Sequence, residues 1–166
     1  MQKYIIFTLA SLAVIVGLAL WGRPSGEDTY TSSYASALSL GSLISQEESF
    51  DFGSISMAAG TVTHNFIVKN TGSDPITIGK MYTSCMCTEA SLITAVKRFG
   101  PYGMQGHGMI PRTNVELAPG EEATVEAVFD PAAHGPAGIG QIRRTITMEN
   151  SGGRPLEFTI TANVTP

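Results

Sequence analysis

Apolar and polar residues alternate along most of the chain from about residue 47 onward. In the segment 122–129, EATVEAVF, every second residue from Ala123 to Phe129 is apolar. Such alternation is typical of a β-strand with one face buried and the other in solvent. The pattern predicts strands at 50–55, 61–69, 75–84, 114–117, 122–129, 142–148 and 156–164. Six or seven short strands separated by turn sequences predict an all-β fold, an immunoglobulin-like antiparallel β-sandwich over residues 47–166.

The first part of the chain has a different pattern. Residues Tyr4–Trp21 form an uncharged apolar run, about 27 Å long as a helix, which is close to the roughly 30 Å hydrocarbon core of a bilayer. Lys3 precedes the run and Trp21 closes it at an interfacial position. We predict a signal anchor at residues 1–22, a single transmembrane helix with a cytoplasmic N-terminus, in preference to a cleaved signal peptide. Both interpretations place the following domain outside the cytoplasm, and the anchor places it at the cell membrane.

Residues 23–46 are rich in serine, threonine and glycine and have no sustained period. They predict a flexible extracytoplasmic linker with an end-to-end distance of about 25–30 Å. A short amphipathic turn around Leu38–Ile44 is the alternative. The predicted organisation is therefore an anchor at 1–22, a linker at 23–46 and a sandwich at 47–166.

Composition and charge narrow the class of function. Only 14% of the 166 residues are charged, and the formal net charge is −4. Nucleic-acid-binding proteins normally concentrate lysine and arginine against phosphates, so we expect no nucleic-acid partner. The sequence also lacks the G-x-S-x-G and H-E-x-x-H motifs of common hydrolases and has no phosphate-binding loop. We therefore do not expect an enzyme.

Strand order predicts where the residues with useful chemistry gather. Successive strands of a sandwich generally reverse direction, so the strands 75–84 and 122–129 end at the same end of the domain. Three segments would meet there: 83–88, the connection 88–113 and the loop 130–140. We call this end of the domain, which faces away from the linker, the rim.

The rim segments hold most of the soft or titratable ligand types in the chain. These residues are Cys85, Cys87, Met104, His107 and His134. Thiolate, thioether and imidazole groups together favour Cu(I) and also suit zinc. A thioether is a poor zinc ligand, so the methionine favours copper. We predict a metal site at the rim, for copper first and zinc second.

Other interpretations of the same residues stay open. Cys85 and Cys87 could form a disulfide, bind metal or remain free thiols, and one of them could serve a thiol enzyme as nucleophile or redox centre. His107 and His134 could instead stabilise their loops through hydrogen bonds, and the methionine could pack in the core. His64 shares the parity of buried positions and is expected to be a core histidine. The alternative function is a non-enzymatic protein-interaction or scaffold module of the cell envelope.

Four motifs in order resemble a known family. They are Phe50–Gly53 (FDFG), Gly60–Gly72 (GTVTHNFIVKNTG), Ser84–Thr88 (SCMCT) and Pro119–Glu122 (PGEE). They are similar to the bacterial domain-of-unknown-function family 1573, which is related to immunoglobulin-like ASH and major-sperm-protein domains, and the similarity covers about residues 48–165. The resemblance implies an extracytoplasmic β-sandwich without an established activity. Family members typically carry S-C-G-C-T, whereas Met86 replaces the central glycine here, so we expect an altered turn with an added thioether.

Overall fold

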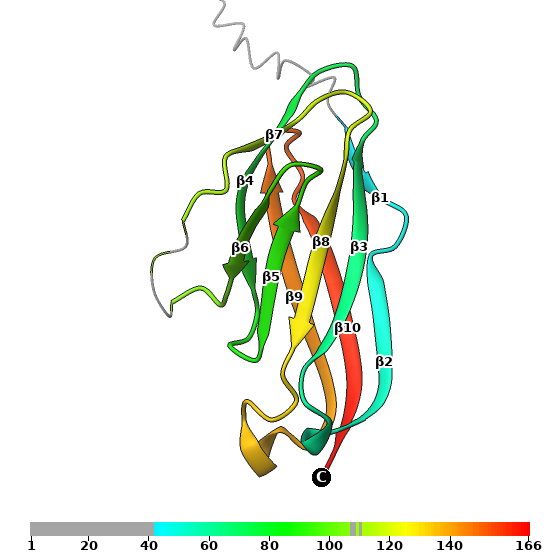
Figure 1. Ribbon diagram of the computed structural model, residues 1–166, viewed down its shortest axis with the longest axis vertical. Coiled ribbons are helices and arrows are strands. Elements are labelled where there is room, and N and C mark those ends of the chain that lie inside the picture. Colours follow the sequence, from blue (N-terminus) through cyan, green and yellow to red (C-terminus); the bar gives the residue numbers. More distant parts are fainter. Residues whose placement is uncertain (1–41, 107–108, 110) are drawn as a thin grey trace, which may run out of the picture. The chain divides into compact units, whose positions relative to one another are not determined.

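The computed structural model describes residues 42–106, 109 and 111–166. These residues form two five-stranded sheets packed face to face, with the strand orders β1-β3-β8-β5-β6 and β2-β10-β9-β4-β7 (Figure 1). The predicted all-β sandwich is therefore confirmed. Its elements are β1 (Leu43–Ser45), β2 (Ser49–Ser56), η1 (Met57–Ala59), β3 (Val62–Asn70), β4 (Ile76–Thr83), β5 (Thr88–Ile93), β6 (Arg98–Tyr102), β7 (Val115–Leu117), β8 (Glu122–Phe129), η2 (Gly135–Gly138), β9 (Gly140–Asn150) and β10 (Leu156–Thr165).

The predicted anchor at 4–21 and most of the predicted linker lie outside the described residues. Within 42–106, 109 and 111–166, no helix combines the length and apolar character that a bilayer crossing requires. The described end of the predicted linker is a strand, because Leu43–Ser45 pairs with β3 as β1. Leu43 packs against the core, so the sandwich begins before the expected boundary at residue 47.

Alternation places the side chains as predicted. In β8, every second residue from Ala123 to Phe129 is buried, and the residues between them are partly exposed. Phe66 of β3 and Phe158 of β10 are fully buried and stack on each other, with ring centroids 4.8 Å apart. This aromatic contact joins the two sheets, because β3 and β10 belong to different ones.

One strand pair differs from the predicted antiparallel arrangement. β2 and β10 pair in parallel, with Ser49 opposite Thr159, whereas the other described strand pairs are antiparallel. The two strands run toward the same end of the domain, and β2 lies at the edge of its sheet beside β10. The second sheet is therefore mixed.

The hairpin of β5 and β6 was not predicted. In β5, Ala90, Ser91 and Leu92 are all buried, so the alternation of polar and apolar positions is lost. β6 contains Gly100 and Pro101, residue types that usually argue against a strand interior. A hairpin returns the chain to the end from which it left. The predicted directions of the other strands are therefore unchanged.

An ion pair between Arg98 of β6 and Glu126 of β8 links these strands across β5. Both terminal guanidinium nitrogens donate to the carboxylate, Nη2 to Oε2 at 3.1 Å. The hydrogen bond from Arg98, together with the attraction of its charge, lowers the pKa of the Glu126 carboxyl, although burial acts in the opposite direction. The pair helps to hold β6, the strand that leads to Met104.

Asn70, at the end of β3, closes the end of the sandwich opposite the rim. Its side chain is fully buried, and Nδ2 donates to the carbonyl oxygens of Asp74 at 2.8 Å and Leu117 at 2.9 Å. Its Oδ1 accepts a hydrogen bond from the amide of Gly72 at 3.0 Å. One side chain thus joins the turn after β3 to the end of β7.

Candidate functional site

The turn between β4 and β5 carries both cysteines. The Thr88 amide donates to the Cys85 carbonyl at 3.1 Å, and the Thr83 hydroxyl lies 2.9 Å from the carbonyl oxygens of both Cys85 and Thr88. The amide of Asp130 donates to the Cys87 carbonyl at 2.9 Å, which joins this turn to the loop after β8. Thr83 and Thr88 are buried, so their hydrogen bonds are shielded from water and hold the turn in place.

Met86 occupies the outer position of this turn and is 57% exposed. Among the described non-glycine residues, Asn114 alone has a positive φ, so the backbone of Met86 lies in the ordinary region. Glycine is therefore not required at position 86. The S-C-M-C-T sequence forms a turn without backbone strain at the methionine.

Cys85 and Cys87 are joined by a disulfide, with 5.3 Å between their Cα atoms. Among the alternatives left open by the sequence, the structure therefore describes the disulfide. Both cysteines are buried, with exposures of 8% for Cys85 and 3% for Cys87. Metals bind cysteine as the thiolate, so the closed disulfide argues against metal binding in this state.

His134 lies beside the disulfide, as the strand directions predicted. Its Nε2 is 3.1 Å from the Sγ of Cys85. The ligand atoms of Cys85, Cys87 and His134 all lie within 4.8 Å of one another. A Cβ added at Gly138 would lie 3.2 Å from the Cβ of His134, so glycine at this position leaves room for the histidine. His134 is exposed, whereas the cysteines are buried, and it is the part of the cluster that solvent reaches.

Arg144 completes the surroundings of the sulfur atoms and was not predicted. Its Nε donates to the Sγ of Cys87 at 3.1 Å, and its Nη1 donates to the Arg143 carbonyl at 2.9 Å. Within the described part of the chain, its half-buried guanidinium forms no ion pair with a carboxylate. The sequence held a signal, because Arg144 shares the parity of Ile142 and Ile146, which point toward the core.

Of the other two predicted ligands, the structure describes Met104. Met104 forms an isolated bridge with Thr83 and lines a cavity of about 330 Å³ together with Tyr82, Ser84 and Gln105. It therefore lies beside the strand that leads to Cys85. His107 lies outside the described residues.

His64 packs against core aromatics but is only partly buried, so the prediction of a core histidine is met in part. Its ring stacks on Phe50 with centroids 3.6 Å apart and meets Phe66 edge-on at 4.7 Å. Its Nε2 lies 2.9 Å from a carboxylate oxygen of Glu47. These contacts account for the position of the His64 side chain, so no metal is needed to explain it.

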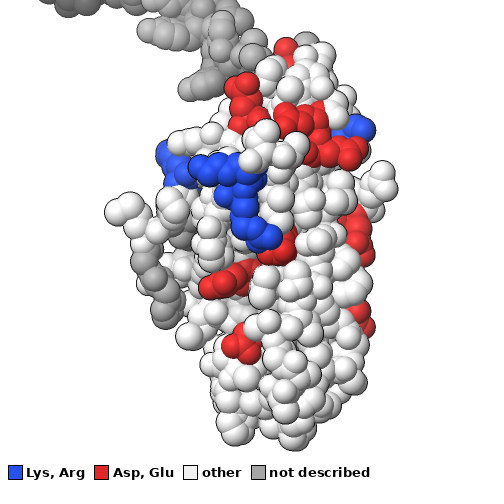
Figure 2. Space-filling model, viewed as in Figure 1, with Lys and Arg blue, Asp and Glu red and all other residues white. Residues whose placement is uncertain are grey.

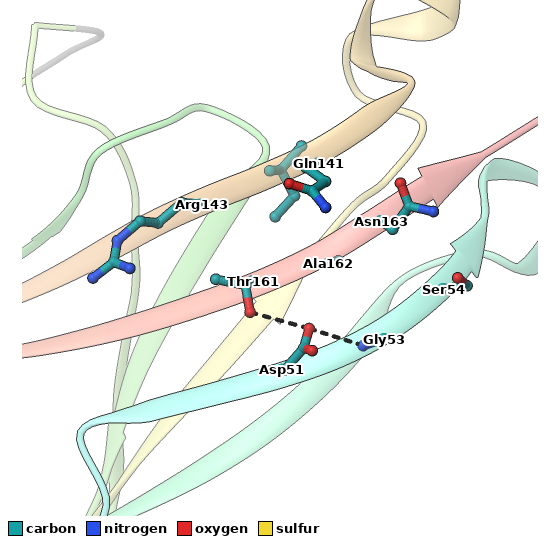
Figure 3. Close-up of a pocket in the computed structure, with 9 residues that line it drawn as sticks. Asp51, Gly53, Ser54, Gln141, Arg143, Thr161, Ala162 and Asn163 are labelled. Atoms are coloured by element: carbon teal, nitrogen blue, oxygen red, sulfur yellow. Dashed lines mark hydrogen bonds between the residues drawn. The ribbon is translucent and has the colours of Figure 1, made fainter.

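A larger groove lies elsewhere, on the outer face of the second sheet (Figure 3). Its volume is about 570 Å³, and the register of β2 against β10 shifts within it, between Thr161 and Asn163. The Asp51 carboxylate accepts hydrogen bonds from the Thr161 hydroxyl and the Gly53 amide, both at 3.0 Å. Arg143 lines this groove. Among the residues that the structure describes, no predicted ligand, thiol or imidazole lines this groove, so the sulfur cluster is the stronger candidate site.

The rim carries few charges. Figure 2 shows almost no charged side chains at the lower end of the viewed face, where Figure 1 places η1, η2 and the C-terminus. The segments 83–88, 131–142 and 162–166 contain no charged residue. Two large apolar side chains are exposed in these segments, Met86 at 57% and Ile139 at 45%. The disulfide therefore lies near a sparsely charged, partly apolar surface, and the charged residues Asp130 and Arg144 contact Cys87.

Comparison with known families confirms the resemblance inferred from the sequence. Residues 43–101 match the family described as "Protein of unknown function (DUF1573)". This match covers the first part of the sandwich, including the turn with both cysteines. No curated protein matches the chain.

Solved structures with a similar fold are distant in sequence. A protein of unknown function from Porphyromonas gingivalis W83 has a TM-score of 0.55 and 14% identity, over 74% of this chain and 46% of that one. A family 123 glycoside hydrolase from Clostridium perfringens has a TM-score of 0.50 and 7% identity, over 70% of this chain and 22% of that one. The ASH/PapD-like domain of human CEP192 has a TM-score of 0.45 and 12% identity, over 74% and 84%. The chain spans less than half of the Porphyromonas and Clostridium proteins, and these identities show the fold alone.

Proposed function

We propose that this chain is a membrane-anchored, extracytoplasmic domain, not an enzyme, that binds a soft metal ion once its disulfide is reduced. The supporting observation is that the ligand atoms of Cys85, Cys87 and His134 lie within 4.8 Å of one another. Two thiolates and an imidazole are ligands of both Cu(I) and zinc. Reduction is required because a closed disulfide offers no thiolate. The proposed location rests on the predicted anchor at 1–22.

Charge balance favours copper over zinc. Cu(I) with two thiolates carries a net charge of −1, which the guanidinium of Arg144, 3.1 Å from the Cys87 sulfur, would neutralise. Zn²⁺ with two thiolates is already neutral, so the same guanidinium would leave a positive charge in a half-buried site, where unpaired charge is costly. Structural zinc also takes four ligands, whereas this cluster supplies three among the described residues. Met104 and His107 stay the candidates for a further ligand.

The test is a Cu(I) titration of the purified full-length chain in a mild detergent, under nitrogen, in competition with a chromogenic Cu(I) chelator. We expect one Cu(I) per chain after reduction with a phosphine, and none for the oxidised chain. The double variant Cys85→Ser, Cys87→Ser should bind none. His134→Ala should weaken the affinity by more than roughly 100-fold, because loss of an outer-shell partner of a ligand already costs about 10–100-fold and His134 is proposed as a direct ligand.

His64→Gln is the matched control, because His64 lies in the packing and contacts Glu47 rather than sulfur. It should leave copper binding unchanged. The disulfide closes a loop of only a few residues, so its reduction should cost at most about 2 kcal/mol of stability, and circular dichroism should show a folded reduced chain. Unchanged copper stoichiometry in the double serine variant would contradict the proposal.

A second candidate function is a protein-interaction module of the cell envelope, and the neutral rim with exposed Met86 and Ile139 favours it. Exposed apolar side chains surrounded by uncharged surface are typical of a docking site. A photo-reactive amino acid at position 86 should then crosslink to one protein in whole cells. The same crosslink in the double serine variant would assign the rim to docking without metal. If photo-reactive amino acids at positions 86 and 139 gave no crosslink to a protein, the interaction-module candidate would be contradicted.

A further inference from the structure

We propose that the Cys85–Cys87 disulfide exchanges with a dithiol-bearing protein, whose thiolate attacks Cys85 and releases Cys87. This activity uses the same cysteines as the proposed metal site, but it does not require metal binding. The two sulfur atoms have unequal surroundings, and the surface near them carries few charges.

Cys87 has the better surroundings for a leaving group. Its Sγ receives a hydrogen bond from the Arg144 Nε at 3.1 Å and lies 3.7 Å from the Thr88 hydroxyl. Hydrogen bonds from charged donors are the strongest of their kind, and this guanidinium has no carboxylate partner among residues 42–106, 109 and 111–166. A negative charge that forms on Cys87 would therefore meet a half-buried positive charge already in place.

Cys85 is the more exposed of the two buried cysteines, at 8% against 3% for Cys87, and its Sγ lies 3.1 Å from the exposed His134. Its Sγ receives a hydrogen bond from the Cys87 amide at 3.3 Å, which is a neutral donor, whereas His134 Nε2 donates to this sulfur only in a form that carries a proton on that nitrogen. Thiol–disulfide exchange depends on access to the attacked sulfur and on the stability of the departing thiolate. Both conditions favour attack on Cys85.

The proposed exchange proceeds in two steps, in which atoms, electrons and protons are conserved. A thiolate of the partner attacks the Cys85 Sγ, the bond between Cys85 and Cys87 breaks, and its electron pair leaves on Cys87 beside Arg144. The second thiolate of the partner then attacks the partner sulfur of this mixed disulfide and releases Cys85. The partner dithiol is oxidised to a disulfide, two electrons reduce the Cys85–Cys87 pair, and the two thiol protons of the partner pass to the released thiolates. The reverse sequence reoxidises the pair.

The partner's contact surface should match the rim. The segments 83–88 and 131–142 contain no charged residue, and Met86 lies between the two cysteines at 57% exposure. Met86 and these uncharged segments flank the disulfide, so we expect a sparsely charged, partly apolar surface around the reactive thiol of the partner.

The test uses glutathione as the probe on the oxidised, full-length, wild-type chain in a mild detergent. The reaction is stopped with acid at several times, the remaining thiols are alkylated, and tandem mass spectrometry locates the glutathione. We expect glutathione on Cys85 and the alkyl group on Cys87, in at least tenfold excess over the reverse arrangement. Equal labelling, an excess on Cys87, or no exchange at millimolar glutathione would overturn the proposal.

Arg144→Gln tests the leaving-group role, and Arg143→Gln is the matched control, because the neighbouring arginine lines the outer groove instead. Arg144→Gln should slow exchange about tenfold and reduce the preference for Cys85, whereas Arg143→Gln should change neither. The position of the label is a readout that a general loss of stability would not shift. The wild-type result alone decides the proposal if Arg144→Gln does not fold.

This outcome is separate from that of the metal titration. Selective labelling of Cys85 in a chain that binds no copper would support exchange and contradict the proposed function. Copper binding without selective labelling of Cys85 would support the proposed function and contradict the exchange.

Discussion

Replacing Asn70 with alanine is expected to lower the free energy of unfolding by about 2–4 kcal/mol. The change removes the donor to the carbonyl oxygens of Asp74 and Leu117 and the acceptor for the Gly72 amide, at a side chain that is fully buried. Each buried polar group left without a partner costs about 1–3 kcal/mol. Domains are commonly stable by about 5–15 kcal/mol, so this one side chain would remove a large part of the total. Urea unfolding of the full-length chain in a mild detergent, followed by circular dichroism, measures the difference.

Asn65→Ala is the matched control, because Asn65 lies on the same strand but is exposed. It should change the free energy of unfolding by no more than about 0.5 kcal/mol. Asn70→Asp should be as harmful as the alanine, since a carboxylate has no N–H to donate to the two carbonyl oxygens. Equal stability of the Asn65 and Asn70 variants would show that Asn70 does not close this end of the sandwich.

Replacing Phe66 with alanine should cost about 3–5 kcal/mol, the usual range for loss of a buried phenylalanine. Phe66 is fully buried, stacks on Phe158 with centroids 4.8 Å apart and meets the edge of His64 at 4.7 Å. The substitution would leave a cavity between the two sheets, where the aromatic contact now joins them. The midpoint of urea unfolding should fall at an unchanged slope if the unfolded state is unaffected.

Ile67→Ala provides the comparison for this core position. Ile67 is the next residue on β3 and is 47% exposed, so its truncation should cost less than about 1 kcal/mol. Phe66→Leu, which keeps most of the apolar volume, should fall between the two alanine variants. A cost for Phe66→Ala no larger than that for Ile67→Ala would contradict the assignment of Phe66 to the joint between the sheets.

The alternation of apolar and polar residues correctly predicted the strands that have one face buried and the other in solvent. It did not predict strands that lack this arrangement. β5 lies between β8 and β6 and buries three successive residues from Ala90 to Leu92, so its sequence has no period of two. β6 contains a Gly-Pro pair and β1 has only three residues. These three strands form because they pair with neighbouring strands, and the local sequence pattern does not show that pairing.

The rim was partly predictable for a physical reason. An additional hairpin reverses the chain twice, so the missed β5 and β6 did not disturb the prediction that His134 and the two cysteines meet. The position of the Arg144 side chain was not predicted, because arginine usually points to solvent. Along β9, however, Arg144 lies on the same face as Ile142 and Ile146, which point toward the core. Whether the cysteines were paired depended on the local turn held by Thr83 and Thr88, which the spacing of the cysteines does not specify.

The parallel pairing of β2 with β10 has a consequence for biosynthesis. Ser49 lies opposite Thr159, so the edge of this sheet cannot assemble until nearly the whole domain has been made. Cys85 and Cys87 precede His134 and Arg144 in the chain, and a nascent polypeptide therefore presents both thiols before their imidazole and guanidinium neighbours exist. In the extracytoplasmic location that we propose, the two thiols would reach an oxidant during translocation before Arg144 can contact Cys87, so the order of synthesis would favour early oxidation of the pair.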